Sequence, residues 1–324
     1  MKYTGAAHQP NPVVTGALFA GLLALIIIAG LVLPFGIFIL LLSPVAVVVT
    51  SVRAGIQTGV IAATGAGLLL ALVLGPFKAV TLAGGSGLVG LSMGLALRRK
   101  YSPRYGVMAA GAGFVLTLVG AGLAFWWLTG TSPLQAVSNS LASSREAAIE
   151  LYRQMGHEED VLQRLNQAWD QAMAQLWLVF PTVVGVTIAV FSLFNYLLAG
   201  TILGRMGVEV RPLPPFADWR FPPAIVLGYA LGFLGIWLKG RYDIAQLYPI
   251  GLNLYLIFTL AFAVEGMALV YYYLVKADFP RWSRILLLLT LLVVPVLPQA
   301  TVWLGMADLA FDFRRLKLPF ARRD

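Results

Sequence analysis

Few residues in this chain could do chemistry, and the most conspicuous is an acid inside a long apolar run. Glu265 stands between Val264 and Gly266 and is followed closely by three tyrosines at 271–273. A carboxylate inside a membrane is costly, so it is a functional candidate by default. Glu265 could bind a cation, relay a proton or pair with a polar neighbour. A carrier coupled to protons or cations requires Glu265 to face a hydrated cavity, and a packed or lipid-facing position would exclude that role.

Three amides stand in other apolar runs. Together with Glu265 they form a tentative set of binding residues: Asn195, Asn253 and Gln299. Amides inside membrane helices serve more often as hydrogen-bonding partners between helices than as ligand-binding groups. Both roles stay open for these three.

Metal-binding and catalytic patterns are weak. Asp308 and Asp312 are four residues apart, so a helix would place both carboxylates on one face. There they could hold a metal ion or, as we favour, pair with the neighbouring Arg314 and Arg315. His8 and His157 are far apart, and the sequence contains no cysteine. An HExxH motif, a phosphate-binding loop and a GxSxG elbow are all missing. We therefore expect no enzyme, no metal site and no cofactor.

Glycine and alanine recur at four-residue spacing in the first part of the chain. The positions are Gly16, Ala20 and Ala24 in one run and Gly55, Gly59, Ala63 and Gly67 in another. Residues four apart share one face of a helix, and small residues let two membrane helices approach closely. Such a face more often packs inside a bundle. The sharper hypothesis is a docking face for another membrane protein subunit.

The elements that must position these residues follow from the composition. Of 324 residues, 59% are hydrophobic and 11% are charged, whereas soluble domains carry about 25% charged residues. The apolar residues gather in runs long enough to cross a hydrocarbon core about 30 Å thick, and the runs are too long for barrel strands. We therefore predict an all-α, polytopic transmembrane helical bundle of about 8–10 spans in a lipid bilayer.

The positive charge has a pattern typical of membrane topology. The net charge is +9, and its lysines and arginines stand in short clusters between the apolar runs, for example at 98–100. Such clusters mark cytoplasmic loops and contact anionic lipid. We expect no nucleic-acid partner, and we expect a multi-pass protein of the cell (inner or plasma) membrane.

The apolar runs divide the chain into parts. They cover residues 13–33, 35–51, 54–74, 77–97, 105–128, 176–203, 222–238, 246–275 and 285–311. We interpret 1–205 as a six-span bundle, 206–221 as a Pro-rich cytoplasmic loop, 222–313 as further spans and 314–324 as a basic cytoplasmic tail. The second run contains Pro44, and we expect it to form a hairpin with the first.

The longest polar stretch, 131–175, interrupts the first part. Ser132 followed by Pro133 is typical of a helix start. The apolar residues then keep helical spacing on both sides of Gly156, which predicts two amphipathic helices. No acidic residue precedes Glu146, and this stretch holds six, so we place the insert on the non-cytoplasmic face.

The number of times that the last apolar run crosses the membrane decides on which side the C-terminal tail lies. A single crossing would put the basic tail outside, against the charge rule. Pro295 and Pro298 stand near the middle of the run and each removes a helix donor, so we favour a short hairpin that returns the tail to the cytoplasm. Both termini are then cytoplasmic.

Three segments carry a resemblance to a known family. The segment 303–314, WLGMADLAFDFR, the loop 211–219, RPLPPFADW, and Glu265-Gly266 followed by tyrosines resemble the YybS-like family of bacterial predicted multi-pass membrane proteins. The likeness covers nearly the whole chain. It implies a bacterial inner-membrane protein.

The first six spans also resemble the S component of energy-coupling factor transporters. That resemblance implies a vitamin- or metal-binding bundle that docks on a membrane coupling subunit. It would place the partner against the small residues of the first and third spans, namely Gly16, Ala20, Ala24, Gly59 and Ala63. The spans after residue 221 depart from the six-helix pattern.

Two functions from different classes remain. The leading hypothesis is a membrane-embedded component that binds a small molecule or takes part in transport, and the alternative is a scaffold or assembly protein that acts through helix contacts. A polar cavity in the first six spans that opens to the outer face would favour binding. A filled bundle interior with an exposed groove would favour scaffolding.

Overall fold

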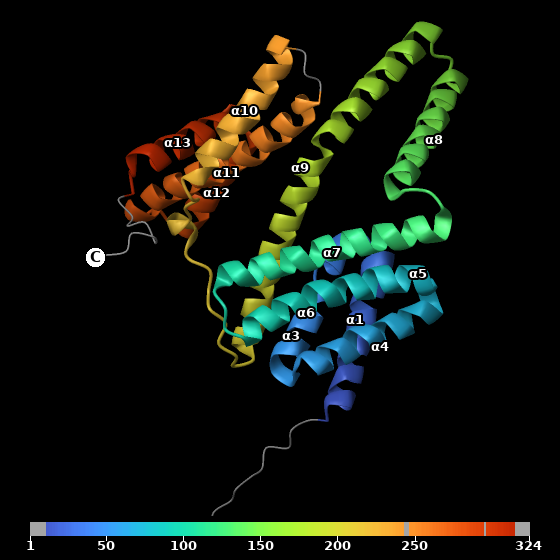
Figure 1. Cartoon of the computed structure of the whole chain (residues 1–324), viewed down its shortest axis with the longest axis vertical. Helices are drawn as coiled ribbons and strands as arrows, with labels where there is room; N and C mark the ends of the chain where they lie inside the picture. Colours follow the sequence, from blue (N-terminus) through green and yellow to red (C-terminus); the bar gives the residue numbers. More distant parts are fainter. Residues whose placement is uncertain (1–10, 243–245, 295, 315–324) are drawn as a thin grey trace, which may run out of the picture. The chain divides into compact units, whose positions relative to one another are not determined.

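The computed structural model describes residues 11–242, 246–294 and 296–314, and over these residues it is helical, with no strand (Figure 1). Eight of the described helical segments are long and apolar enough to cross a membrane. The predicted all-α polytopic bundle is confirmed.

The described helices form two compact units. Unit 1 comprises the residues up to Asn166 together with Thr187–Leu213, and unit 2 comprises Gln167–Val186 together with the residues from Pro214 onward. Helix α9 (Glu159–Arg205) contributes to both units. Each unit has a hydrophobic core of its own.

Unit 1 begins with a series of membrane helices. They are α1 (Pro12–Val32), α2 (Ile37–Leu40), α3 (Ser43–Ala54), α4 (Ile56–Leu74), α5 (Pro76–Ala79), the π-helix η1 (Val80–Gly84), α6 (Gly85–Arg98) and α7 (Pro103–Thr129). Figure 1 shows α4, α6 and α7 side by side. The second predicted run, 35–51, is broken into α2 and α3, because Pro44 occupies the first turn of a new helix and not a helix interior.

The core of unit 1 is packed through small residues. Ala20 and Ala24 of α1 are buried against α4, where Ala63 and Ala66 are also buried. A Cβ added to Gly16 would lie 2.6 Å from Ile61 Cγ2, so the two helices approach as closely as glycine permits. Leu23, Ile27 and Leu70 are fully buried in the same cluster. The bundle interior at this place is therefore filled.

The polar insert forms α8 (Pro133–Gln154) and the first part of α9. The Ser132 hydroxyl accepts a hydrogen bond from the Gln135 amide at 3.2 Å, as expected of an N-cap, and Gly156 takes a left-handed φ of +79° at the predicted break. One expectation is wrong. The second amphipathic helix and the sixth span are one continuous helix of 47 residues. At 1.5 Å per residue it measures about 70 Å, more than twice a hydrocarbon core.

Unit 2 contains the short helix η2 (Phe216–Asp218), α10 (Ala224–Tyr242), α11 (Leu247–Lys276), α12 (Arg281–Val293) and α13 (Leu297–Phe311). Glycines again set the close contacts. A Cβ on Gly266 of α11 would overlap the Thr301 carbonyl of α13, and a Cβ on Gly305 would overlap the Phe262 carbonyl. The backbones of α11 and α13 therefore touch directly.

The last apolar run is two short helices that meet at an angle of 107°. They have 13 and 15 residues, about 20 and 22 Å, so neither crosses a hydrocarbon core alone. The Tyr273 hydroxyl donates to the Phe313 carbonyl at 3.2 Å, and Arg284 of α12 lies 5.9 Å from the centre of the Tyr271 ring. The outer ends of α12 and α13 thus lie beside the same end of α11, which is the arrangement that the expected hairpin requires. Pro295 and tail residues 315–324 lie outside the described residues.

Candidate functional site

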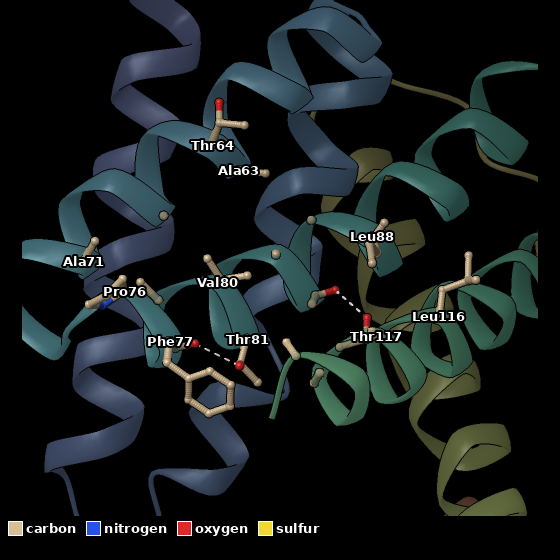
Figure 2. Close-up of a pocket in the computed structure, with 18 of the residues that line it drawn as sticks. Ala63, Thr64, Ala71, Pro76, Phe77, Val80, Thr81, Leu88, Leu116 and Thr117 are labelled. Carbon is tan, nitrogen blue, oxygen red and sulfur yellow. Dashed lines mark hydrogen bonds between the residues drawn. The ribbon is translucent and has the colours of Figure 1, made fainter. Parts of the chain in front are cut away.

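A groove of about 790 Å³ opens on unit 1 between α4, α5, η1, α6 and α7 (Figure 2). Small residues form much of its wall: Ala63, Gly67, Gly84, Gly87, Gly120 and Ala124. A Cβ added at Gly120 would meet no atom within 4 Å, so the groove is open space there. The sequence singled out Ala63 and Gly67, but did not indicate the groove.

The local backbone explains why the groove exists. Gly75, at a φ of +83°, ends α4, and Pro76 starts the short α5 at once. The chain then widens into η1 before α6 begins, and π-helical turns of this kind are frequent at functional sites. The glycines at 84, 85 and 87 put no side chain into the space that results.

The threonine hydroxyls of the groove donate to carbonyls about one turn earlier in the chain, and Thr117 also contacts the Gly85 carbonyl of α6 at 3.4 Å. Thr64 donates to the Val60 carbonyl at 2.8 Å, Thr81 to the Phe77 carbonyl at 2.9 Å and Thr117 to the Gly113 carbonyl at 2.8 Å. Figure 2 shows the Thr81 bond. The hydroxyl oxygens keep acceptor capacity, and the rest of the wall is apolar. An apolar molecule with at most a few donors fits this lining.

The predicted docking face lies largely inside unit 1. Gly16, Ala20 and Ala24 are covered by α4, and a Cβ on Gly59 would overlap the Ser51 side chain. Gly55, at a φ of +108°, joins α3 to α4 beside Arg98. Ala63 and Gly67 are the two predicted positions that also line the groove.

The four tentative binding residues are not gathered at one site. Asn195 is buried in unit 1 and donates to the Phe191 carbonyl of its own helix at 3.0 Å. In unit 2, Asn253 accepts from the Thr182 hydroxyl at 2.7 Å and donates to the Leu178 carbonyl at 2.8 Å, so it joins two helices. Gln299 is exposed on α13.

Glu265 lies in a second polar cluster, in unit 2, where it is fully buried. Its Oε1 pairs with Nη2 of Arg314 at 3.2 Å, and its Oε2 accepts from the Phe221 amide at 3.1 Å. Asp308, also fully buried, binds the same Arg314 Nη2 at 2.6 Å. The carboxylate of Glu265 therefore has a cation and a backbone donor as partners.

Arg314 is the centre of this ion cluster. Its Nε donates to Asp308 at 2.8 Å, and its Nη1 donates to the carbonyls of Ala217 and Trp219, each at 2.8 Å. With the two Nη2 contacts, all five N–H groups of the guanidinium have a partner. Arg314 thus ties the end of α13 to α11 and to the loop around η2.

A second arginine closes the cluster. Arg220 of the same loop lies 2.9 Å from Asp312 and 3.8 Å from Glu265, and it donates to the Asp308 carbonyl at 3.2 Å. Asp308 and Asp312 are therefore engaged in ion pairs, the alternative that we favoured. No group of three or more metal-ligating side chains occurs in the part of the chain that the structure describes.

These contacts place Glu265 in a packed interior with arginine partners, and not in the hydrated cavity that the carrier hypothesis requires. The sequence analysis missed Arg220 and Arg314 as partners of Glu265, although the cost of burying an acid was a reason to look for cations in the neighbouring loops.

Comparisons with known proteins agree with this architecture. A family model described as a predicted membrane protein, DUF2232, matches residues 21–309. The chain is 24% identical over 311 residues to the uncharacterized protein YybS of Bacillus subtilis (strain 168), a match that covers 94% of this chain and 98% of that protein. No solved structure matches.

Proposed function

Since the chain belongs to the DUF2232 family of predicted membrane proteins, we propose that it is a membrane-embedded component that binds a small apolar molecule in the groove of unit 1. The observation that carries the proposal is the groove itself. Its volume of about 790 Å³ falls within the range of about 300–1,000 Å³ that is usual for ligand sites.

The surroundings of the groove define the class of ligand. Leu68, Val80 and Leu116 line it and remain 72%, 67% and 59% exposed. In a protein that spans the bilayer, such exposed apolar side chains face lipid tails. The ligand would therefore enter from the bilayer. It would be a lipid-soluble molecule held by apolar contact, with a hydrogen-bond donor directed at a threonine oxygen.

A transport role would need a second protein. The sequence contains no phosphate-binding loop that could couple nucleotide hydrolysis to movement. A role as the substrate-binding subunit of a larger transporter is what the likeness to S components implies.

Native mass spectrometry on gently purified protein tests the proposal. Gly120→Leu places a large side chain in the groove without a clash, because a Cβ there meets nothing within 4 Å. Gly21→Leu is the matched control, since Gly21 is equally open but lies on α1, away from the groove wall. We expect a retained apolar molecule on the unmodified chain and on Gly21→Leu, and its loss from Gly120→Leu. Equal retention by both variants, or none by any form, would refute the proposal.

One observation favours scaffolding as a second function. The core of unit 1 is filled, and a groove walled by glycine and alanine would also let a foreign helix approach closely. The same variants distinguish the two functions. Loss of a copurified membrane protein from Gly120→Leu, with no small molecule on any form, would assign the groove to a partner helix.

A further inference from the structure

A second pocket in unit 1, separate from the groove, has a different chemistry. It encloses about 640 Å³ between the end of α6, the end of α9 and the segment that follows α9. Its wall includes Lys100, Tyr101, Gly204, Glu209 and Arg211. We propose that this pocket binds a phosphate ester, with the headgroup of an anionic phospholipid as its source.

The first reason is the backbone at Lys100. The helices α6 and α9 end in the same hydrogen-bond pattern at this pocket. Lys100 and Tyr101 donate to the carbonyls of Leu97 and Ala96, just as residues 207 and 208 donate to residues 204 and 203. This ending requires a residue in the left-handed conformation just after the end of the helix, and that residue is usually glycine. In α9 that residue is Gly207, at a φ of +77°, whereas in α6 it is Lys100, at +55°.

Lysine is a poor choice for that conformation, because its Cβ crowds the following carbonyl. A strained residue points to a functional use of its side chain. Capping of the helix does not explain the lysine, since backbone amides already bond the last carbonyls of α6. Lys100 is instead one of the residues that line the pocket.

The second reason is charge. The wall contains two cationic residues, Lys100 and Arg211, and one anionic residue, Glu209. Arg99 lies beside the pocket, with its Nη1 3.4 Å from the hydroxyl of Tyr101 in the wall. Arg211 is held in place through its carbonyl, which accepts a hydrogen bond from the buried Tyr196 hydroxyl at 2.8 Å. Arginine and lysine are the side chains that bind phosphate.

The third reason is location. The pocket lies at the ends of apolar helices, in the basic loop that follows α6. Basic clusters next to membrane spans bind the headgroups of anionic lipids. The glycines at 200, 204 and 207 leave the pocket open between these ends, and a Cβ on Gly204 would meet nothing within 4 Å.

A titration of the full chain in mild detergent, followed by native mass spectrometry, tests the site. The probes are short-chain phosphatidylglycerol, short-chain phosphatidylcholine and glycerol 3-phosphate. We expect the chain to bind phosphatidylglycerol most tightly. Equal binding of glycerol 3-phosphate would support the phosphate site and change its source to a soluble ester. Binding of no phosphate-bearing probe would overturn the proposal.

Two variants separate a binding role from a structural one. Lys100→Gly removes the cation and relieves the backbone, so it should raise the melting temperature while binding weakens about tenfold, the value of one charge-assisted hydrogen bond. Lys100→Arg should restore binding. Asp278→Gly is the control, because Asp278 ends α11 in the same left-handed conformation, at a φ of +54°. It should raise the melting temperature and leave binding unchanged.

Gly204→Leu fills the pocket without touching the cations, and it should abolish binding without loss of stability. Two results would contradict the account. Lys100→Gly that binds as tightly as the unmodified chain would exclude Lys100 from the site, and Lys100→Gly that melts at a lower temperature would show that the lysine supports the fold.

Discussion

The two units use their polar groups differently. In the groove of unit 1, each threonine hydroxyl bonds a carbonyl about one turn earlier in the chain, and Thr117 adds a longer contact, 3.4 Å, to the Gly85 carbonyl of α6, so the wall stays largely apolar. In unit 2, Arg314 bonds groups on α11, α13 and the loop around η2, up to 97 residues away in sequence. The ion pairs and hydrogen bonds of Arg314 in unit 2 thus hold separate segments of the chain together. The more conspicuous charged residue, Glu265, belongs to an ion cluster that joins segments, whereas the plainer glycines line the groove that we propose as the ligand site.

Arg314→Ala should lower the stability of the protein more than any other substitution considered. It leaves Glu265 and Asp308 buried beside one fewer cation, which typically costs about 3–5 kcal/mol. We expect a large fall in the melting temperature of the detergent-solubilised protein. Arg164→Ala removes an exposed pair with Asp160 on α9 and should change stability by less than about 1 kcal/mol. Similar melting temperatures for the two variants would show that the ion cluster does not hold unit 2 together.

Gly266→Ala should have the next largest effect. Its Cβ would overlap the Thr301 carbonyl, and backbone cannot move aside as a side chain can. Overpacking of this kind costs about 1–3 kcal/mol. In unit 1, the Cβ of Gly16→Ala would lie 2.6 Å from Ile61 Cγ2 and 2.9 Å from Ile61 Cβ, a milder overlap and one with a side chain, so its cost should be smaller. Thermal unfolding of both variants makes the comparison, and the reverse order would contradict the backbone contact between α11 and α13.

Glu265→Gln should have the smallest effect of the three. The amide oxygen can still accept from the Phe221 amide, and Arg314 keeps its two bonds to Asp308. We expect a loss of about 1–2 kcal/mol, the difference between a hydrogen bond to a charged group and one to a neutral group. A loss as large as that of Arg314→Ala would mean that Glu265, and not Arg314, is the centre of the cluster.

The sequence predicted the helices well where an apolar run and a helix coincide. Runs at 54–74 and 246–275 became α4 and α11 with ends displaced by two residues or fewer. Charge parity predicted a break in the last apolar run, and α12 and α13 meet there at 107°, while the side of the membrane on which the tail lies stays a prediction. The prediction failed at α9, because the change from polar to apolar residues near 176 marks the membrane surface and not a helix end.

The sites were harder to predict than the helices. The bond between Arg314 and Glu265 joins residues 49 positions apart, and no local spacing encodes it. The groove depends on the path of the chain through Gly75, Pro76 and η1, which no periodicity indicates. The glycines at four-residue spacing were visible, but only packing shows which ones are covered and which line open space.

The central claim is that the groove of unit 1, and not the acid of unit 2, forms the ligand site. Native mass spectrometry of Gly120→Leu and Glu265→Gln, purified side by side, tests it most directly. We expect Glu265→Gln to keep the bound molecule and Gly120→Leu to lose it. Loss from Glu265→Gln with retention on Gly120→Leu would instead assign the ligand to the acid of unit 2.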